Sequence, residues 1–234
     1  MDIVYLLKES YENDELTYSL RSLKNLPHDK VFFVGGMPHN INPEKVFHIP
    51  VQQDENKYKN TANSLLTACM CSKVSDDFIL MNDDFFIMSP VRDVKKELNL
   101  HRGLLDDMII FYSTSFPFKD EYLSGLRQTR ELLRRVHIHG PLNYELHTPM
   151  VINKVGMIEI FKLAGLNSVE YPLFRSLYGN LRLKDSQYTN DVKMDALHLD
   201  LPENPTFLST SDNYFKTIKV FMNAIFPDKS EYEL

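Results

Sequence analysis

The sequence has little cysteine and no long apolar run, and each lack excludes a class of protein. Its two cysteines, Cys69 and Cys71, fall in one predicted helix and cannot cross-link distant parts of a 234-residue chain. A reducing compartment suits such a chain, so we expect a cytoplasmic protein, and attachment to the inner face of a membrane stays open. No run of about 18 apolar residues is present, which excludes a membrane-spanning helix of ordinary length.

Two common signals of nucleotide or nucleic-acid binding are also missing. Gly35 and Gly36 follow a predicted strand, but the remaining glycines of a dinucleotide fingerprint and the Lys-Ser/Thr of a Walker loop are absent. The net charge of −6 is unfavourable for a broad nucleic-acid-binding surface. Without a Gly/Ser linker or an internal repeat, we predict a single domain over residues 1–234.

Strand and helix patterns alternate through the first ninety residues. Short apolar runs bounded by turn residues predict strands at 2–7, 31–34, 46–51 and 78–81. Asn13 is a candidate helix N-cap, and residues 57–73 form a second amphipathic helix. This order predicts an α/β fold with a Rossmann-like, mostly parallel central sheet flanked by helices.

The second half is less regular. We expect a helix at 121–136, strand character at 143–153, a helix at 155–164, a short strand at 206–210 and a closing helix that ends at Pro227. The first of these helices belongs to a helical insertion or lid at about 100–140. Its Arg127, Arg130 and Arg134 share one side, where they could meet an anionic acceptor, a membrane or only water.

The segment Asn82-Asp83-Asp84 follows the apolar strand at 78–81. Two adjacent carboxylates at a strand end lie at an exposed edge or are paired, because isolated buried charge is costly. Ligands of open α/β sheets collect at this edge, and hard oxygen ligands suit Mg²⁺ or Mn²⁺. Both carboxylates reach one ion only if the backbone turns between them. A plain turn with capping carboxylates is the alternative.

Four further polar residues occupy positions near predicted strand ends or apolar segments. They are Arg21, His147, Arg175 and Asp212. A metal and arginines neutralise charge on phosphate oxygens, while a histidine or aspartate takes the proton of an attacking hydroxyl. Gathered in one place, these residues suit transfer from an activated phosphate ester.

Four blocks of the sequence, in order, resemble the Stealth family of sugar-phosphate transferases. The opening block is Asp2-Ile3-Val4-Tyr5. The second block comprises residues 14–23 and then 78–86, with Asn82-Asp83-Asp84 inside it. His147-Thr148-Pro149-Met150 with Phe174-Arg175 resembles the third, and residues 207–212 and 226–233 resemble the fourth.

The resemblance implies a nucleotide-sugar transferase of the GT-A kind that depends on Mn²⁺ or Mg²⁺. The donor would be a UDP-linked or related nucleotide-sugar, and a carbohydrate hydroxyl would accept a sugar-1-phosphate, as in capsular polysaccharide synthesis. Carried onto this chain, Asp83 and Asp84 would organise metal and diphosphate, Arg21 and Arg175 would neutralise phosphate, and His147 would be the base.

Other functions stay open on the sequence. An ordinary glycosyltransferase would share the fold, the donor and most site residues but would transfer the sugar itself. A glycosyltransferase acting on modified nucleic-acid bases is disfavoured by the acidic charge. A non-catalytic carbohydrate- or nucleotide-binding module would not need both the Asp83-Asp84 pair and His147.

Overall fold

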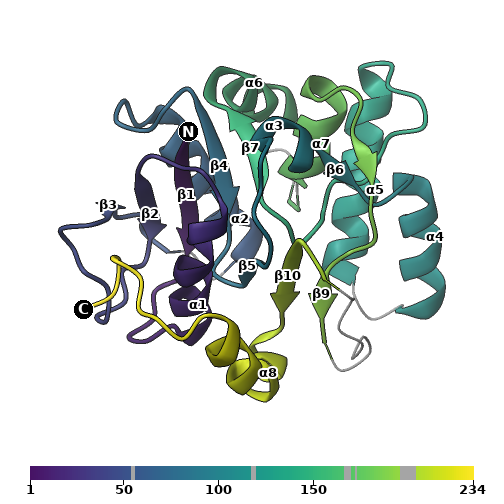
Figure 1. The fold of residues 1–234 in the computed structure, drawn as a ribbon. Coiled ribbons are helices and arrows are strands. Elements are labelled where there is room, and N and C mark those ends of the chain that lie inside the picture. The colour runs from purple at the N-terminus through teal and green to yellow at the C-terminus, as the bar shows by residue number, and fades with distance from the viewer. Residues whose placement is uncertain (54–55, 117–119, 166–169, 172, 196–203) are drawn as a thin grey trace.

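A five-stranded sheet forms the centre of the molecule. The computed structural model describes residues 1–53, 56–116, 120–165, 170–171, 173–195 and 204–234 (Figure 1). The strand order is β3-β2-β1-β4-β7. Neighbours among the first four strands pair in parallel, and β7 is antiparallel to β4. The bounds are β1 (Asp2–Leu7), β2 (Val31–Gly35), β3 (Phe47–Ile49), β4 (Asp77–Met81) and β7 (Met150–Asn153). The prediction of a mostly parallel α/β sheet is confirmed.

Both faces of the central strands are buried, and residue parity decides the face. Ile3 and Tyr5 pack with the apolar stripe of α1 (Asp14–Ser22), whereas Val4 packs with α2 (Lys57–Met70) and α6 (Lys154–Ala164). Successive side chains of a strand point to opposite faces, so a continuous apolar run fills two cores at once. Burial of each large apolar side chain contributes about 1.5–3 kcal/mol to the free energy of unfolding.

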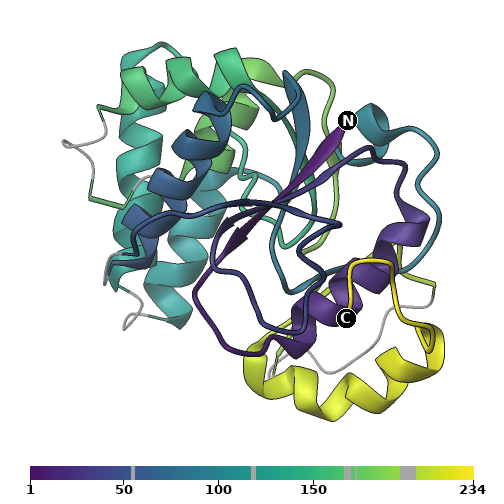
Figure 2. The same cartoon turned by 90° about the vertical axis from the view of Figure 1, so that its left-hand side faces the viewer.

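Figure 2 shows the two layers that cover the sheet. The purple α1 and the yellow α8 (Asp212–Ile225) lie on one side, and the blue α2 lies on the other with the teal helices. Asn13 begins α1 as expected, since its side chain accepts a hydrogen bond from the amide of Leu16 at 2.9 Å. A short 3₁₀ turn, η1 (Leu23–Asn25), continues α1 before Pro27.

A second, three-stranded sheet has the order β5-β10-β9. It contains β5 (Phe85–Ile87), β9 (Lys193–Met194) and β10 (Phe207–Thr210). In this sheet β10 runs antiparallel to β5 and parallel to β9. The chain passes from β4 to β5 through a turn in which the Phe85 amide donates to the Asn82 carbonyl at 3.2 Å. The strands β9 and β10, which are distant from β4 in sequence, therefore lie near the end of β4.

The helical part of the chain packs beside the end of the main sheet. It includes α4 (Leu105–Ser115), α5 (Asp120–Arg135) and α7 (Phe174–Arg182), with the short elements α3 (Val94–Glu97), β6 (Leu100–His101) and β8 (Gln187–Tyr188). The predicted helix at 121–136 is present as α5, and the interpretation of 100–140 as an insertion or lid stays a prediction. Within the described ranges, none of the helices combines the length and apolar character that crossing a membrane requires.

Candidate active site

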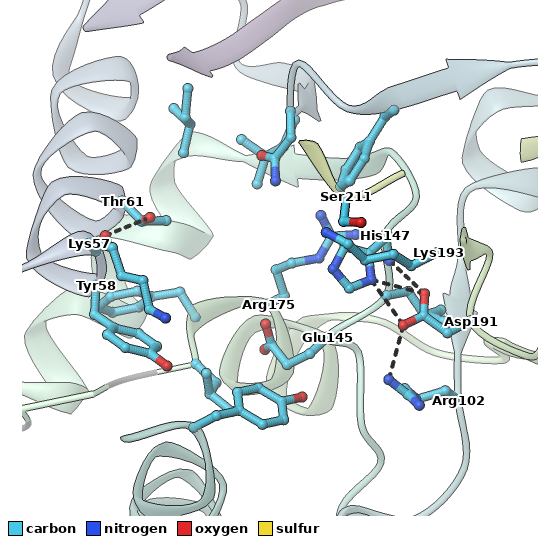
Figure 3. A pocket seen from close by; sticks show the side chains of 18 of the residues that line it. Lys57, Tyr58, Thr61, Arg102, Glu145, His147, Arg175, Asp191, Lys193 and Ser211 are labelled. Carbon is cyan, nitrogen blue, oxygen red and sulfur yellow. Dashed lines mark hydrogen bonds and ion pairs between the residues drawn. The ribbon is translucent and has the colours of Figure 1, made fainter. Parts of the chain in front are cut away.

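A cavity of about 1210 Å³ opens at the carboxyl ends of β1 and β4. Leu6, Leu80 and Asn82 line it there, which is the edge where open α/β sheets bind ligands. Figure 3 shows the first turn of α2, with Lys57, Tyr58 and Thr61, on one wall and Asp191 with Arg102 on the opposite wall. The volume lies above the usual 300–1,000 Å³ of small-ligand pockets, so there is room for an extended ligand.

The loop before β7 brings Glu145 and His147 into the cavity. Regular strand structure begins only at Met150, so the prediction of strand character from residue 143 was wrong for its first half. The loop backbone is held by hydrogen bonds with side chains of α7 and not by pairing with a neighbouring strand. The amide of Tyr144 donates to Ser176 Oγ at 3.0 Å, and Asn180 bonds both backbone groups of Leu142.

His147 is oriented by Asp191. The imidazole Nδ1 lies 2.9 Å from Asp191 Oδ2, and the backbone amide of His147 donates to Asp191 Oδ1 at 3.1 Å. Arg102 Nη1 binds the same carboxylate at 3.0 Å. Burial alone would raise the pKa of Asp191, but the bonds from His147 and the charge of Arg102 outweigh it and bring the pKa to about 2.

This pairing decides the proton position on the His147 ring. At neutral pH the ionised Asp191 carboxylate can only accept hydrogen bonds, so Nδ1 carries the proton. With the proton on Nδ1, Nε2 is the ring nitrogen whose lone pair can act as a base. Because His147 lines the cavity, a hydroxyl bound there could transfer its proton to this nitrogen.

Arg175 lies beside the histidine, on α7. Its Nε donates to the Tyr144 carbonyl at 3.2 Å and its Nη2 to the Thr148 carbonyl at 2.5 Å, so the guanidinium is held on both sides of the His147 loop. The group also lies 5.8 Å from the centre of the Phe85 ring. Burial lowers the pKa of Arg175 and raises that of Glu145, and the attraction between the two charges opposes both shifts.

Asp84 takes part in a second polar cluster next to the cavity. Its Oδ2 accepts a hydrogen bond from Ser209 Oγ at 2.9 Å and lies 3.3 Å from Lys193 Nζ. These three residues lie together because β10 pairs with both β5 and β9. In the register Ser209 stands opposite Phe85, the residue after Asp84, and opposite Lys193. Lys193 lines the cavity, and so does Asn82.

The two adjacent carboxylates have different partners. Asp83 Oδ2 accepts a hydrogen bond from Asn13 Nδ2 at 2.6 Å, whereas Asp84 holds Ser209 and Lys193. In the described part of the chain no group of three His, Cys, Asp or Glu side chains could hold a metal ion. An ammonium group on Asp84 is also unfavourable for a divalent cation there. The predicted Mn²⁺ or Mg²⁺ stays a prediction, and these contacts do not favour it.

One of the predicted phosphate-binding residues, Arg21, does not line the cavity. Arg21 makes a two-bond pair with Glu233, at 2.9 and 2.7 Å, and donates to the Phe226 carbonyl at 3.0 Å. It therefore ties α1 to the end of the chain, because all three contacts lie on that side of the molecule. Asp212 begins α8, but its side chain lies outside the described part, so its role stays a prediction.

The predicted arginine stripe of α5 is divided by its contacts. Arg130 Nη1 lies 3.1 Å from Asp106 of α4, and Arg127 donates to Ser113 of the same helix at 3.3 Å. Arg134 is exposed. The first two arginines thus contact α4, and whether the three bind an acceptor, a membrane or only water stays a prediction.

The sequence analysis missed the cavity residues in and around β9. Asp191, Lys193 and Asp195 all line the cavity, while Met194 between them is buried. This alternation of polar and apolar residues is the signal of a half-buried strand and could have identified the segment. Glu145 and Arg102 carried no comparable local pattern.

The fold defines the class of protein that this chain resembles in structure. A mostly parallel sheet with helices on both faces, an antiparallel edge strand and a cavity at the carboxyl ends match the GT-A glycosyltransferase fold. The structure aligns with the galactosyltransferase LgtC in complex with donor and acceptor sugar analogues, at a TM-score of 0.53 and 10% identity. The alignment covers 98% of this chain and 96% of LgtC.

A second crystal structure, of an active-site variant of LgtC, aligns over 81% of this chain and 73% of that one, with 12% identity and a TM-score of 0.44. No family model matches the sequence. No curated protein matches it either. The alignment with a TM-score of 0.53 therefore establishes the fold, and the resemblance to the Stealth family stays a prediction.

Proposed function

We propose that this protein is a transferase that uses a nucleotide-sugar donor and a carbohydrate hydroxyl as acceptor. The observation that carries the proposal is the His147–Asp191 pair, which faces a cavity at the donor-binding edge of a GT-A fold. A histidine held by an ionised carboxylate is an arrangement that suits general-base catalysis. LgtC, which shares the fold, was crystallised with both donor and acceptor sugar analogues.

The proposed roles follow from the contacts of each side chain. His147 Nε2 takes the proton of the acceptor hydroxyl as its oxygen attacks, and Asp191 stabilises the imidazolium that forms. Arg175 faces the negative charge that develops on the phosphate oxygens or the leaving nucleotide. Asn82 contributes an amide to the donor pocket at the end of β4.

The first candidate reaction is transfer of a sugar-1-phosphate. The acceptor oxygen attacks the phosphorus next to the donor sugar, and a nucleoside monophosphate leaves with the electrons of the broken P–O bond. The four-block Stealth resemblance supports this version, and His147 serves it because the attacking nucleophile must lose a proton.

The second candidate is transfer of the sugar itself. In that case the acceptor oxygen attacks the anomeric carbon, and a nucleoside diphosphate leaves. The structural likeness to the galactosyltransferase LgtC favours this version. The two reactions share donor, acceptor class and cavity, so the nucleotide product distinguishes them.

The test is nucleotide release from a panel of UDP-, GDP- and CMP-sugars, with Mn²⁺, with Mg²⁺ and with EDTA, using mixed oligosaccharides as acceptors. Mass spectrometry identifies the nucleotide. A nucleoside monophosphate from a UDP- or GDP-sugar supports sugar-phosphate transfer, and a nucleoside diphosphate supports sugar transfer. A His147→Ala variant should lose release with either product, because both reactions need the proton removed.

The matched control is His137→Ala, since His137 is an exposed histidine at the end of α5 and does not line the cavity. If no nucleotide is released and no donor of the panel binds in calorimetry, the protein is not a nucleotide-sugar transferase. Donor binding without release under any condition would identify a non-catalytic binding module instead.

A further inference from the structure

We propose that Lys193 takes the place of a divalent cation between Asp84 and the diphosphate of the donor, so that donor binding needs no metal. The inference rests on the proposed nucleotide-sugar donor and assigns a phosphate subsite that the sequence patterns did not reveal. It accounts for an ion pair at the position where the Asp83-Asp84 segment predicted a metal.

The two sheets fix the position of the lysine. Ser209 of β10 stands opposite Phe85 of β5 on one side and opposite Lys193 of β9 on the other. Asp84, which directly precedes β5, therefore lies beside both side chains and accepts from Ser209 Oγ at 2.9 Å. Ser209 and Lys193 are carried by paired strands and Asp84 by the turn that leads into β5, so the strand register places the lysine beside Asp84.

A lysine ammonium can do part of the work of a bridging cation. It has three donors, and Asp84 at 3.3 Å engages one side of it. Lys193 also lines the cavity, and its side chain keeps 29% of its surface exposed. The remaining donors can thus meet phosphate oxygens, just as Mg²⁺ commonly bridges a carboxylate to substrate phosphates.

The surroundings favour a fixed monovalent cation over a mobile divalent one. Figure 3 shows the side chains of Arg175, His147 and Lys193 directed toward the same part of the cavity, near Ser211. Arg175 lies within electrostatic range of Asp84. A divalent ion at Asp84 would be repelled by two nearby positive charges, whereas a diphosphate would be attracted by both.

The strand pattern supports the assignment independently of the ion pair. Asp191 and Lys193 are two residues apart at the start of β9, and both line the cavity. Asp191 orients His147, the proposed base. The same short segment would then position the base and bind the donor phosphates, which places the acceptor hydroxyl next to the bond that breaks.

The experiment is calorimetric binding of UDP and of GDP to the full chain in EDTA and again with excess Mn²⁺. We expect wild-type binding in EDTA that Mn²⁺ strengthens by less than about threefold. Lys193→Met keeps the length of the side chain and removes its charge, and we expect it to weaken binding in EDTA by about 10- to 100-fold, the range of a charge-assisted hydrogen bond. Lys162→Met, at an exposed lysine of α6, is the matched control.

Three outcomes overturn the inference. These are wild-type binding that appears only with Mn²⁺, unchanged binding by a folded Lys193→Met variant, and absence of UDP and GDP binding under both conditions. The first leaves the proposed function intact, because a metal-dependent transferase still releases nucleotide in the product assay. If circular dichroism shows that Lys193→Met is unfolded, the wild-type comparison with and without Mn²⁺ decides alone.

Discussion

Asp191 binds His147 at two points, through the ring Nδ1 at 2.9 Å and through the backbone amide at 3.1 Å. The carboxylate therefore fixes the position of the loop as well as the orientation of the imidazole. Arg102 holds the carboxylate from the other side at 3.0 Å, and its own amide donates to the Asn143 carbonyl of the same loop. The Asp191 carboxylate thus connects the loop that carries His147 to Arg102 and to the segment before β9.

His147→Ala should lower turnover without abolishing donor binding. Removal of a general base costs about 10²- to 10⁴-fold in rate, whereas the phosphate contacts proposed for Arg175 and Lys193 remain. The measurement is kcat for nucleotide release together with the donor dissociation constant. A variant that loses donor affinity but keeps kcat would show that His147 binds the donor and is not the base.

Asp191→Asn should lower the free energy of unfolding at neutral pH, and the difference from wild type should become smaller in acid. The folded pKa of Asp191 is about 2, below the usual 3.8, so its ionised form contributes stability that is fully present above about pH 5 and is lost as pH falls toward 2. This lowering of the pKa corresponds to about 2 kcal/mol in the free energy of unfolding. Urea unfolding of wild type and variant at pH 7 and pH 3 measures it, and an equal difference at both pH values would contradict the prediction.

Arg21→Met should reduce stability and leave the donor dissociation constant unchanged. The Arg21 and Glu233 side chains are only 12% and 6% exposed, and breaking a buried ion pair leaves one uncompensated charge, at a cost of about 3–5 kcal/mol. Lys219→Met is the control, because the exposed Lys219–Asp14 pair is worth less than about 1 kcal/mol. Donor affinity that falls with Arg21→Met in the folded fraction would restore the phosphate-binding role.

Gly179→Ala should disturb the loop that carries His147 through packing. A Cβ at this position of α7 would overlap the ring of Tyr144, whose backbone carbonyl accepts from Arg175. Overpacking of this kind costs about 1–3 kcal/mol. Thermal unfolding and kcat should therefore both decrease.

The matched control for that packing prediction is Gly156→Ala, in α6. A Cβ there meets its nearest neighbour, the Tyr178 ring, at 3.4 Å, which is ordinary contact. Alanine is the better helix former by up to about 1 kcal/mol, so this variant should keep or gain stability. Equal destabilisation by both substitutions would show that the Tyr144 ring is not the cause.

The sequence by itself determined the fold class and most of its elements. Apolar runs at residues 2–7, 31–34 and 78–81 could bury both faces only as central strands, and Asn13 capped the helix that its position predicted. These features depend on neighbours within one or two turns of chain, so a local pattern contains the information. His147 and Asn82 also reached the cavity, because the loops at the ends of sheet strands share one edge, and Arg175 reached it from α7.

Only the tertiary structure decided which charges pair. Asp191 is 44 residues from His147, Lys193 is 109 residues from Asp84, and Glu233 is 212 residues from Arg21. Each pairing depends on strand register or on where a distant segment crosses, and a one-residue shift of β9 against β10 would turn Lys193 away from Asp84. Charged residues at exposed strand ends have many possible partners in the sequence, and the packing of the two sheets selects one.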